Sequence, residues 1–210
     1  MILDLGSLCK ANDVVPRGVI HIGAHEGREL RAYNQLGIQN ILFIEANPTV
    51  YEKLCANVGK QPNVKTANCA ISDKNGMVEF HITSFDQSSS ILPLKKHLEL
   101  YPGIIETKKM HVVCKTLDTL LKELNISPGT YNIINIDIQG AELLALRGGI
   151  ETLKNVDAIN TEVNFDELYE GCALIQDMDQ FLGSMGFKRV QTLTPYHPSW
   201  GDAFYVKTRG

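Results

Sequence analysis

The sequence predicts an α/β fold in which helices cover a mostly parallel β-sheet. Two apolar runs support this prediction. The run Val19–Ile22 leads into two glycines and a segment that can begin a helix, and the run 41–44 ends at an acidic residue, Glu45. A third apolar segment follows one further helix, so the order up to residue 71 is β-α-β-α-β. This order is typical of parallel strands joined by crossover helices.

Periodicity and end signals define the elements of the first third of the chain. Pro16 separates a short lead-in helix from the first strand, Gly37 ends the first crossover helix, and Pro48 begins the second. Apolar residues recur every four positions in that second helix, which predicts one buried face. The expected elements are a helix over 2–12, a strand over 19–22, a helix over 29–36, a strand over 41–45, a helix over 48–58 and a strand over 64–71.

The middle of the chain departs from this alternation. Asn75-Gly76 predicts a turn, and residues 77–82 alternate between polar and apolar side chains as a strand does. The polar run 84–90 predicts a loop, and two prolines interrupt the residues that follow it. We therefore expect residues 84–109 to form an insertion or lid, with a short strand over 111–115 after it.

The rest of the chain returns to alternating helices and strands. Thr116 or Asp118 can cap a helix over 117–124, and the paired glycines Gly148-Gly149 can end a later one. The remaining expected elements are a central strand over 131–138, a helix over 143–149, a strand over 156–163, a helix over 172–185, the segment 187–193 and a last strand over 203–207.

Length and composition limit the class of protein. The 210 residues, 44% of them hydrophobic, fit one domain over 1–210 with a core over 17–207. Lys and Arg total 20 against 24 acidic residues, a net charge of −4 that gives no footprint for general nucleic-acid or membrane binding. The five cysteines are isolated, which indicates buried thiols rather than a zinc cluster or disulfide framework. Without a signal-like or membrane-spanning segment, we expect a cytoplasmic protein.

The glycines after the first strand are the first candidate for a ligand site. Gly23 can permit a tight turn, and Gly27 can let the backbone approach a ligand without a Cβ between them. Glu45 follows about twenty residues later, where Rossmann-type folds place the carboxylate that binds both ribose hydroxyls. The G-x-x-x-G spacing differs from the dinucleotide fingerprint, and no basic residue stands at the strand end to bind a 2′-phosphate. Together these features favour a nucleoside-containing ligand.

Polar residues also follow the other expected strands. In an open parallel sheet, ligands bind beyond the carboxyl ends of the strands, where the strand order reverses. The polar segments predicted at these ends are 21–27, 45–47, 72–73, 137–142 and 162–164. We therefore expect these five segments to surround one site.

Taken together, these blocks resemble the FkbM family of S-adenosylmethionine-dependent methyltransferases. The blocks are Ile22–Gly27, Phe43–Pro48, Asn68–Asp73, Ser88–Ser90 and Ile136–Leu143, and the resemblance extends over residues 19–206. Its most specific part is 137–148, which matches the family's D-x-x-G-x-E followed by leucines and a glycine. The resemblance implies the class I methyltransferase (Rossmann-like) fold, with a seven-stranded, mostly parallel sheet whose last strand is antiparallel, helices on both faces and a small insertion.

The resemblance also implies which residues bind the cofactor, S-adenosylmethionine. The implied positions are Gly23, Ala24 and Gly27 at its methionine half, Glu45 at the ribose hydroxyls, Ser72 and Asp73 at the adenine, and Asp137 beside the ammonium and the transferred methyl. The full set expected to contact the cofactor is His21, Gly23, Ala24, Glu26, Gly27, Glu45, Ala46, Asn47, Ser72, Asp73, Ser89, Asp137, Gln139 and Glu142. His21 departs from the family, because many members have an aspartate at this position.

Methyl transfer to an alcohol needs an oxygen held close to an electrophilic methyl group and a base for its proton. The expected catalytic residues are Asp137, Glu162 and His25, with His197 as a further candidate base. Glu162 is the strongest second choice, because it ends the strand expected beside the one that presents Asp137. The side chains of Asp137, Glu142, Glu162 and Asn164 offer oxygen ligands suited to magnesium or calcium. Sequence spacing alone does not bring these residues together, so no metal is predicted.

The sequence therefore predicts an S-adenosylmethionine-dependent methyltransferase that acts on a hydroxyl of a small metabolite, sugar or other glycan. Residues 84–109 and 164–171 would shape the acceptor pocket. An NAD-dependent oxidoreductase is an alternative that shares the role of Glu45, although the loop spacing and the lack of a central Tyr-x-x-x-Lys pair disfavour it. A second alternative, suggested by His21, is a module of the same fold that binds the cofactor without catalysis.

Overall fold

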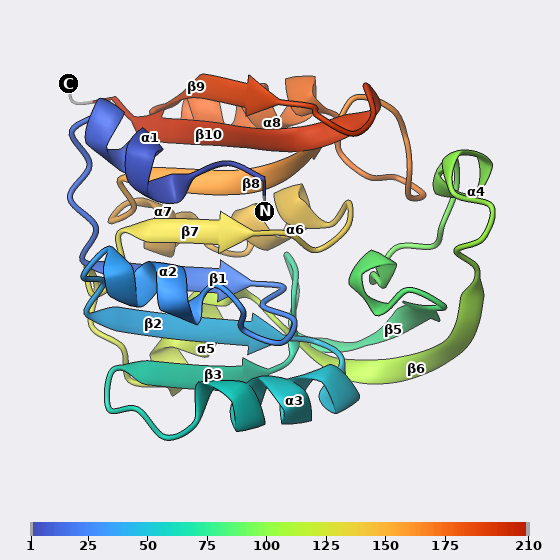
Figure 1. Cartoon of the computed structure of the whole chain (residues 1–210), viewed down its shortest axis with the longest axis horizontal. Coiled ribbons are helices and arrows are strands. Elements are labelled where there is room, and N and C mark those ends of the chain that lie inside the picture. The colour runs from blue at the N-terminus through green and yellow to red at the C-terminus, as the bar shows by residue number, and fades with distance from the viewer. Residues whose placement is uncertain (1, 209–210) are drawn as a thin grey trace.

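The structure, a computed structural model that describes residues 2–208, contains two β-sheets (Figure 1). The larger sheet has the strand order β3-β2-β1-β7-β8-β10-β9, and the smaller has the order β4-β6-β5. The elements in chain order are α1 (Leu5–Ala11), β1 (Gly18–Ile22), α2 (Leu30–Gln35), β2 (Asn40–Glu45), α3 (Pro48–Val58), β3 (Val64–Asn68), β4 (Ala70–Ile71), β5 (Gly76–Thr83), the 3₁₀ turn η1 (Asp86–Ser88), α4 (His97–Leu100), β6 (Glu106–Lys115), α5 (Leu117–Glu123), β7 (Ile133–Ile136), α6 (Glu142–Arg147), α7 (Ile150–Leu153), β8 (Ala158–Asn164), α8 (Ile175–Ser184), β9 (Phe187–Leu193) and β10 (Trp200–Lys207).

The larger sheet confirms the predicted seven-stranded, mostly parallel arrangement. Strand β1 pairs in parallel with β2 on one side and β7 on the other, while β10 is antiparallel to both β8 and β9. The chain first builds outward from β1 to β3 and later returns to the opposite side of β1, so the strand order reverses between β1 and β7. A ligand crevice is therefore expected beyond the carboxyl ends of these two strands.

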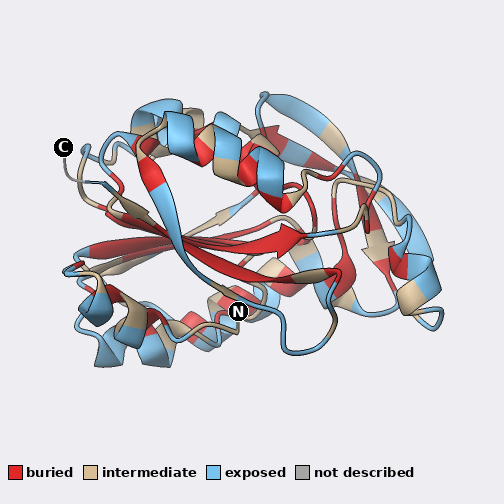
Figure 2. Ribbon diagram, turned by 90° about the horizontal axis from the view of Figure 1, so that it is seen from above, coloured by how far each residue is buried: buried red, intermediate tan, exposed pale blue. Residues whose placement is uncertain are grey.

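Helices cover both faces of the larger sheet, which explains the continuous apolar runs in its central strands. Val19 packs in a core with residues of α1, α2 and α3, whereas its neighbours Ile20 and Ile22 pack in a second core with residues of α5, α6 and α8. Figure 2 shows the buried strands between two helical layers whose outer surfaces are exposed. The strands are thus held from both sides, and their carboxyl ends form a rigid base for the site.

The smaller sheet projects beyond the carboxyl ends of the larger one (Figure 1). It has a small core of its own, formed by Ala70, Phe80, Val112 and Cys114. The excursion between β5 and β6 carries η1 and α4. Both elements lie beyond the carboxyl ends of β1 and β7, where the strand order reverses, as a lid would.

The strand expected over Val64–Ile71 is divided between the two sheets. Residues 64–68 pair with β2, but the side-chain amide of Asn68 then donates hydrogen bonds to the carbonyls of Glu45 and Ala46, at the end of that strand. After this point the chain changes partner, and Ala70 pairs with Cys114 of β6. The apolar pattern continues across the break, so no local signal marks it.

Two further elements differ from the sequence prediction. Residues 106–109, expected in the insertion, belong to β6, which pairs along its length with β5. Their side chains are exposed, so this part of the strand lacks the apolar alternation that would have predicted it. Gly148 and Gly149 end α6 as expected, but a short helix that was not predicted, α7, follows them directly.

The helix caps, the cysteines and the lengths of the helices can also be compared with the sequence expectations. Thr116 caps α5 through its side chain, and Pro48 occupies the first turn of α3 behind the capping residue Asn47. All five cysteines are free thiols, and four of them are buried. Within residues 2–208, every helix is too short or too polar to cross a membrane.

Replacing Gly23 by alanine tests the contact at the reversal point. Gly23 has φ +80°, and a Cβ there would lie 1.9 Å from the backbone oxygen of Asp137. We expect Gly23→Ala to lower the free energy of unfolding by more than about 3 kcal/mol in urea denaturation, because backbone must move. Gly37→Ala is the matched control: its φ is +69° with open space around it, so about 1–2 kcal/mol is expected. Equal losses in both variants would contradict the steric argument.

Candidate active site

The turn after β1 holds the Glu45 carboxylate in place. Gly23 and Ala24 donate backbone hydrogen bonds to the carbonyl of Ile44, at 2.9 and 3.0 Å. His25, which has φ +48°, donates its backbone N–H to Glu45 Oε2 at 2.9 Å, and Asn47 donates its own to Oε1 at 2.8 Å. The glycine turn and the carboxylate at the end of β2 are therefore in direct contact, as binding of one shared ligand requires.

The end of β7 meets the same turn from the other side. Asp137 donates its backbone N–H to the carbonyl of Ile22 at 3.0 Å. The chain of β7 therefore runs beside β1 as far as Ile22, the last residue of β1. The backbone oxygen of Asp137 occupies the space that a Cβ on Gly23 would need. Only a residue without a side chain allows these two loops to approach so closely.

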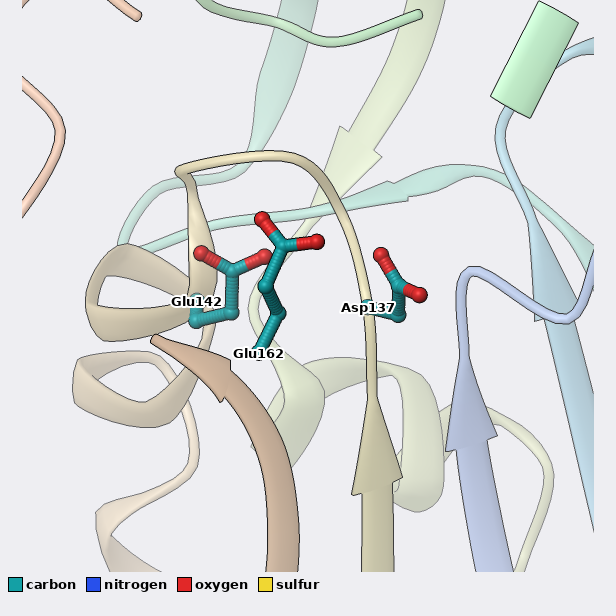
Figure 3. Close-up of side chains that lie close together, drawn as sticks. All are labelled: Asp137, Glu142 and Glu162. Atoms are coloured by element: carbon teal, nitrogen blue, oxygen red, sulfur yellow. The ribbon is translucent and has the colours of Figure 1, made fainter. Parts of the chain in front are cut away.

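Three carboxyl groups converge beneath the loop between β7 and α6 (Figure 3). Oxygens of Asp137, Glu142 and Glu162 lie within 4.8 Å of one another. Gln139 Nε2 donates to Asp137 Oδ1 and to Glu162 Oε2, each at 2.8 Å, while Glu142 Oε1 accepts the backbone N–H groups of Ile138 and Gly140. The strands therefore assemble acids that sequence spacing alone could not bring together.

Burial and the charges of neighbouring acids favour the protonated forms of Glu142 and Glu162. Loss of solvation raises the pKa of Glu142 to about 7, and it raises the pKa of Glu162 well above its ordinary value, with the Asp137 charge adding to the second shift. Burial also raises the pKa of Glu45, against the lowering effect of its two backbone hydrogen bonds. The site can thus hold protons on its buried carboxyl groups.

A cavity of about 600 Å³ opens at the reversal point of the strand order. This volume lies within the range of roughly 300–1,000 Å³ that small-molecule sites occupy. Its wall includes the turn after β1, the ends of β2, β7 and β8, the smaller sheet, and parts of η1 and α4. The cavity therefore connects Glu45 at one side with the paired carboxylates of Asp137 and Glu162 at another.

The profile of one protein family, the methyltransferase FkbM domain, matches residues 21–189. The chain belongs to the FkbM methyltransferase family. A relative, the 2-O-methyltransferase NoeI of Sinorhizobium fredii, is 32% identical over 161 residues, which cover 73% of this chain and 65% of that protein. The FkbM-family chain thus spans just under two thirds of the length of this relative.

Solved structures support the fold of this FkbM-family chain. Magnesium protoporphyrin IX methyltransferase of Synechocystis, solved with bound S-adenosylmethionine, has a TM-score of 0.54 at 9% identity, covering 97% of this chain and 76% of its own. A protein of Listeria monocytogenes assigned as an S-adenosylmethionine-dependent methyltransferase has a TM-score of 0.56 at 11% identity, covering 97% and 99%. Identities this low establish the class I methyltransferase fold alone.

Most residues that the sequence suggested for the FkbM-family site lie on the cavity wall. They come from five loops that are far apart in the chain, so their shared position agrees with the expectation that strand ends surround one site. The expected residues found on the wall are His21, Gly23, Ala24, His25, Glu26, Glu45, Ala46, Ser89, Asp137, Gln139 and Glu162.

Gly27, Asn47 and Glu142 lie off the cavity wall and contact the helices and loops next to it. A Cβ on Gly27 would meet side chains of α3, so this glycine permits helix packing rather than approach of a ligand. Asn47 caps α3, and the Glu142 carboxyl is occupied by backbone N–H groups of the loop before α6. These contacts give the three residues structural roles, and their expected contacts with the cofactor stay a prediction.

Ser72 and Asp73, expected at the adenine, also lie away from the cavity. The backbone oxygen of Ser72 packs against Gly148, and Asp73 is exposed to solvent. The residues just before them, Ala70 and Ile71, line the cavity instead. The expected site was displaced by two positions because the chain enters the smaller sheet at β4.

His21 belongs to a buried hydrogen-bond network. Its Nδ1 lies 3.0 Å from the hydroxyl of Tyr33, and Asn135 Nδ2 donates to its Nε2 at 3.3 Å and to the same hydroxyl at 2.8 Å. Burial lowers the pKa of His21, so the ring is neutral at physiological pH. His21 thus places an uncharged group where many family members have an acid, and Asp137 is the acid at the end of β7 whose backbone contacts the Gly23 turn.

The two other candidate histidines lie in different surroundings. His25 is on the wall, with its Nε2 3.1 Å from Asp86 Oδ1 of η1, so it links the first turn to the excursion. His197 Nδ1 accepts the backbone N–H of Ser199 and lies off the cavity wall. The expectation that His197 could act as a base therefore gains no support from its position and stays a prediction.

One side of the wall carries the rings of His97, Tyr101, Tyr169, Tyr196 and Trp200. The ranges 84–109 and 164–171, expected to shape the acceptor pocket, contain three of these residues, but sequence reasoning missed Tyr196 and Trp200. The five residues come from α4 and the residue after it, the segment between β8 and α8, the loop between β9 and β10, and the start of β10, so no local spacing connects them. The lone tryptophan beside Asp202 was the one sequence feature that could have drawn attention to this region.

The raised pKa of Glu142 predicts how stability depends on pH. Between pH 4.5 and about 7 the native protein keeps a proton that the unfolded chain loses, so stability falls as pH rises through this range. We expect Glu142→Gln to remove a penalty on the order of 3 kcal/mol, since Gln Oε1 can still accept the two N–H bonds. The difference in melting temperature, variant minus wild type, should therefore be larger at pH 8 than at pH 5.

The matched control is Glu151→Gln, which changes an exposed glutamate paired with Lys154 on α7. Its melting temperature should follow wild type at both pH values. A Glu142→Gln curve that runs parallel to wild type from pH 5 to pH 8 would show that Glu142 carries no shifted proton.

Proposed function

We propose that this chain is an S-adenosylmethionine-dependent methyltransferase that methylates a hydroxyl oxygen of a small molecule or glycan. The observation that carries the proposal is the joining of the Gly23 turn, Glu45 and Asp137 around one cavity at the reversal point of the sheet. Family membership and the O-methyltransferase relative support the same activity. Oxygen as the methyl acceptor follows the chemistry that the name of this relative states.

The cavity suits the parts of S-adenosylmethionine. Each Glu45 oxygen already accepts one backbone N–H and has a second lone pair for a ribose hydroxyl. Ala46 packs with Ala70 and Phe80, which gives an apolar surface next to Glu45 for the adenine. The Asp137 carboxylate would hold the methionine ammonium, a role that neutral His21 cannot perform.

The residues at the other side of the cavity would prepare the acceptor. When bound, S-adenosylmethionine supplies an electrophilic methyl group on a sulfonium sulfur. Glu162, held by Gln139, would take the proton of the acceptor hydroxyl in its ionised form, in which its raised pKa makes it a stronger base than an ordinary glutamate. The excursion over 84–105 and the segment 164–171 would exclude water and hold the acceptor oxygen in line.

The two other functions considered for the sequence are less well supported. A nicotinamide-dependent oxidoreductase would share Glu45, but the family match is to methyltransferases. A cofactor-binding module without catalysis would retain the cavity. Such a module does not require a buried acid with a raised pKa, Glu162, beside Asp137 at the opposite wall.

Calorimetric titration tests the cofactor. We expect the wild-type chain to bind S-adenosylhomocysteine and not NAD. Glu45→Gln should weaken S-adenosylhomocysteine binding at least roughly tenfold, because a carboxylate oxygen that accepts a ribose hydroxyl is lost. Glu52→Gln, an exposed residue of α3, is the control and should bind as wild type does. Tight binding of NAD, or none of S-adenosylhomocysteine, would overturn the proposal.

Transfer of labelled methyl from S-adenosylmethionine to acceptors in a cell extract tests catalysis. We expect wild type and Glu151→Gln to label a product, and Glu162→Gln to do so at least about a hundredfold more slowly because a base is missing. Binding of S-adenosylhomocysteine by Glu162→Gln should remain within about twofold of wild type. If wild type binds the cofactor but labels nothing, the non-catalytic module is correct.

A further inference from the structure

A buried imidazole on the cavity wall lacks a hydrogen-bond partner. The His97 side chain is only 4% exposed, and its Nδ1 is buried with no partner among residues 2–208. Burial lowers the pKa of His97, so the ring is neutral and presents one donor and one acceptor. A buried polar atom without a partner costs about 1–3 kcal/mol. His97 also lines the cavity, so a ligand hydroxyl there can reach its ring.

Aromatic rings surround this imidazole and continue toward the cavity mouth. His97 contacts the rings of Tyr101 and Tyr169, with centroids 5.1 and 5.5 Å apart. The indole N–H of Trp200 donates to the Tyr101 hydroxyl at 3.0 Å, and Tyr196 stacks on Trp200 at 5.8 Å. Tyr196 is 73% exposed, so the aromatic wall reaches from a buried histidine to solvent. We name these five residues the aromatic subsite.

The aromatic subsite is held rigidly and is connected to the acidic groups. Backbone N–H groups of Lys95 and His97 donate to the carbonyl of Leu168, which ties α4 to the segment after β8. Tyr169 packs its ring against His97 and donates its hydroxyl to Gln139 Oε1 at 2.6 Å. Gln139 in turn binds Asp137 and Glu162 through its Nε2. The unpaired imidazole and the carboxylates thus lie on either side of one tyrosine.

We propose that the aromatic subsite binds the ring of a pyranoside acceptor, with one sugar hydroxyl on His97 and another directed to Asp137 and Glu162. This inference rests on the proposed methyltransferase function and adds the chemical class of the acceptor. The aromatic faces would pack against the C–H surface of the sugar, and Tyr196 would contact a further residue of the glycan at the mouth.

A polyhydroxylated ring fits this wall better than a simple alcohol or a phenol. A ligand with one hydroxyl could satisfy the carboxylates but would leave the imidazole unpaired and buried. A site with fixed polar groups rejects ligands that lack the matching hydroxyl, because its own groups are then left unsatisfied. A pyranoside has hydroxyls at separate positions and an apolar face between them, as this wall requires.

The protein contains a single tryptophan, Trp200, which makes ligand binding at this wall directly measurable. We would titrate the full chain, saturated with S-adenosylhomocysteine, with the α- and β-methyl glycosides of glucose, galactose, mannose and fucose, and with cyclohexanol and catechol. We expect at least one glycoside to change Trp200 fluorescence saturably and, when S-adenosylmethionine replaces S-adenosylhomocysteine, to accept labelled methyl, while cyclohexanol and catechol do neither.

His97→Phe should raise the dissociation constant of that glycoside at least roughly tenfold, because one hydroxyl loses its partner, and leave S-adenosylhomocysteine binding unchanged. His97→Asn, which keeps a polar side chain, should recover part of the loss. His111→Phe is the matched control, since His111 is exposed on β6 and lies off the cavity wall. Melting temperatures of all three variants would identify any that fail to fold.

The outcomes separate this inference from the proposed function. If wild type binds S-adenosylhomocysteine but no glycoside alters Trp200 fluorescence, or if catechol is the better ligand, the pyranoside inference is wrong and the methyltransferase proposal stands. Unchanged glycoside affinity in His97→Phe would equally overturn it. If S-adenosylhomocysteine itself does not bind, the proposed function fails first.

Discussion

The close contact between Gly23 and the backbone of Asp137 determines the geometry of this site. Two neighbouring parallel strands end at the same level, and their loops can touch only because one of them has no Cβ at the point of contact. From this point the first turn continues to Glu45, and the second continues to Gln139 and the acids around it. The positions of the cavity, of Glu45 and of the acidic groups therefore all depend on this one backbone contact.

The same arrangement explains why charge in the site is unevenly distributed. The strand ends bring three carboxyl groups close together, and two of them have raised pKa values because they are buried beside other acids. Next to these acids, His21 on β1 is neutral and belongs to a network of uncharged groups that includes Asn135 on β7. Asp137 lies between these two environments and is the natural position for a cationic group of a ligand.

The sequence was informative wherever local pattern and tertiary environment agreed. Strands β1, β2 and β7 are apolar along much of their length because helices bury both faces, and that pattern predicted the sheet and its ligand edge. The outer part of β6 is exposed, so its pairing left no apolar signature. The aromatic subsite joins the α4 region, the chain after β8, the loop between β9 and β10 and the start of β10, and only the fold brings these regions together. Gly27 was assigned to a ligand because helix packing and ligand approach require the same absence of a side chain.

The smaller sheet has its own core, and the excursion between β5 and β6 leaves from its far end. Changes in that excursion that keep Asp86, which contacts His25, and Ser90, which bonds the loop after β7, would leave β1, β2, β7 and their loops undisturbed. Lineages of this fold could then acquire new acceptors by rewriting some twenty residues while inheriting the donor-binding half unchanged. Modularity of this kind makes the excursion the natural segment to transplant when the specificity of such a protein is to be redesigned.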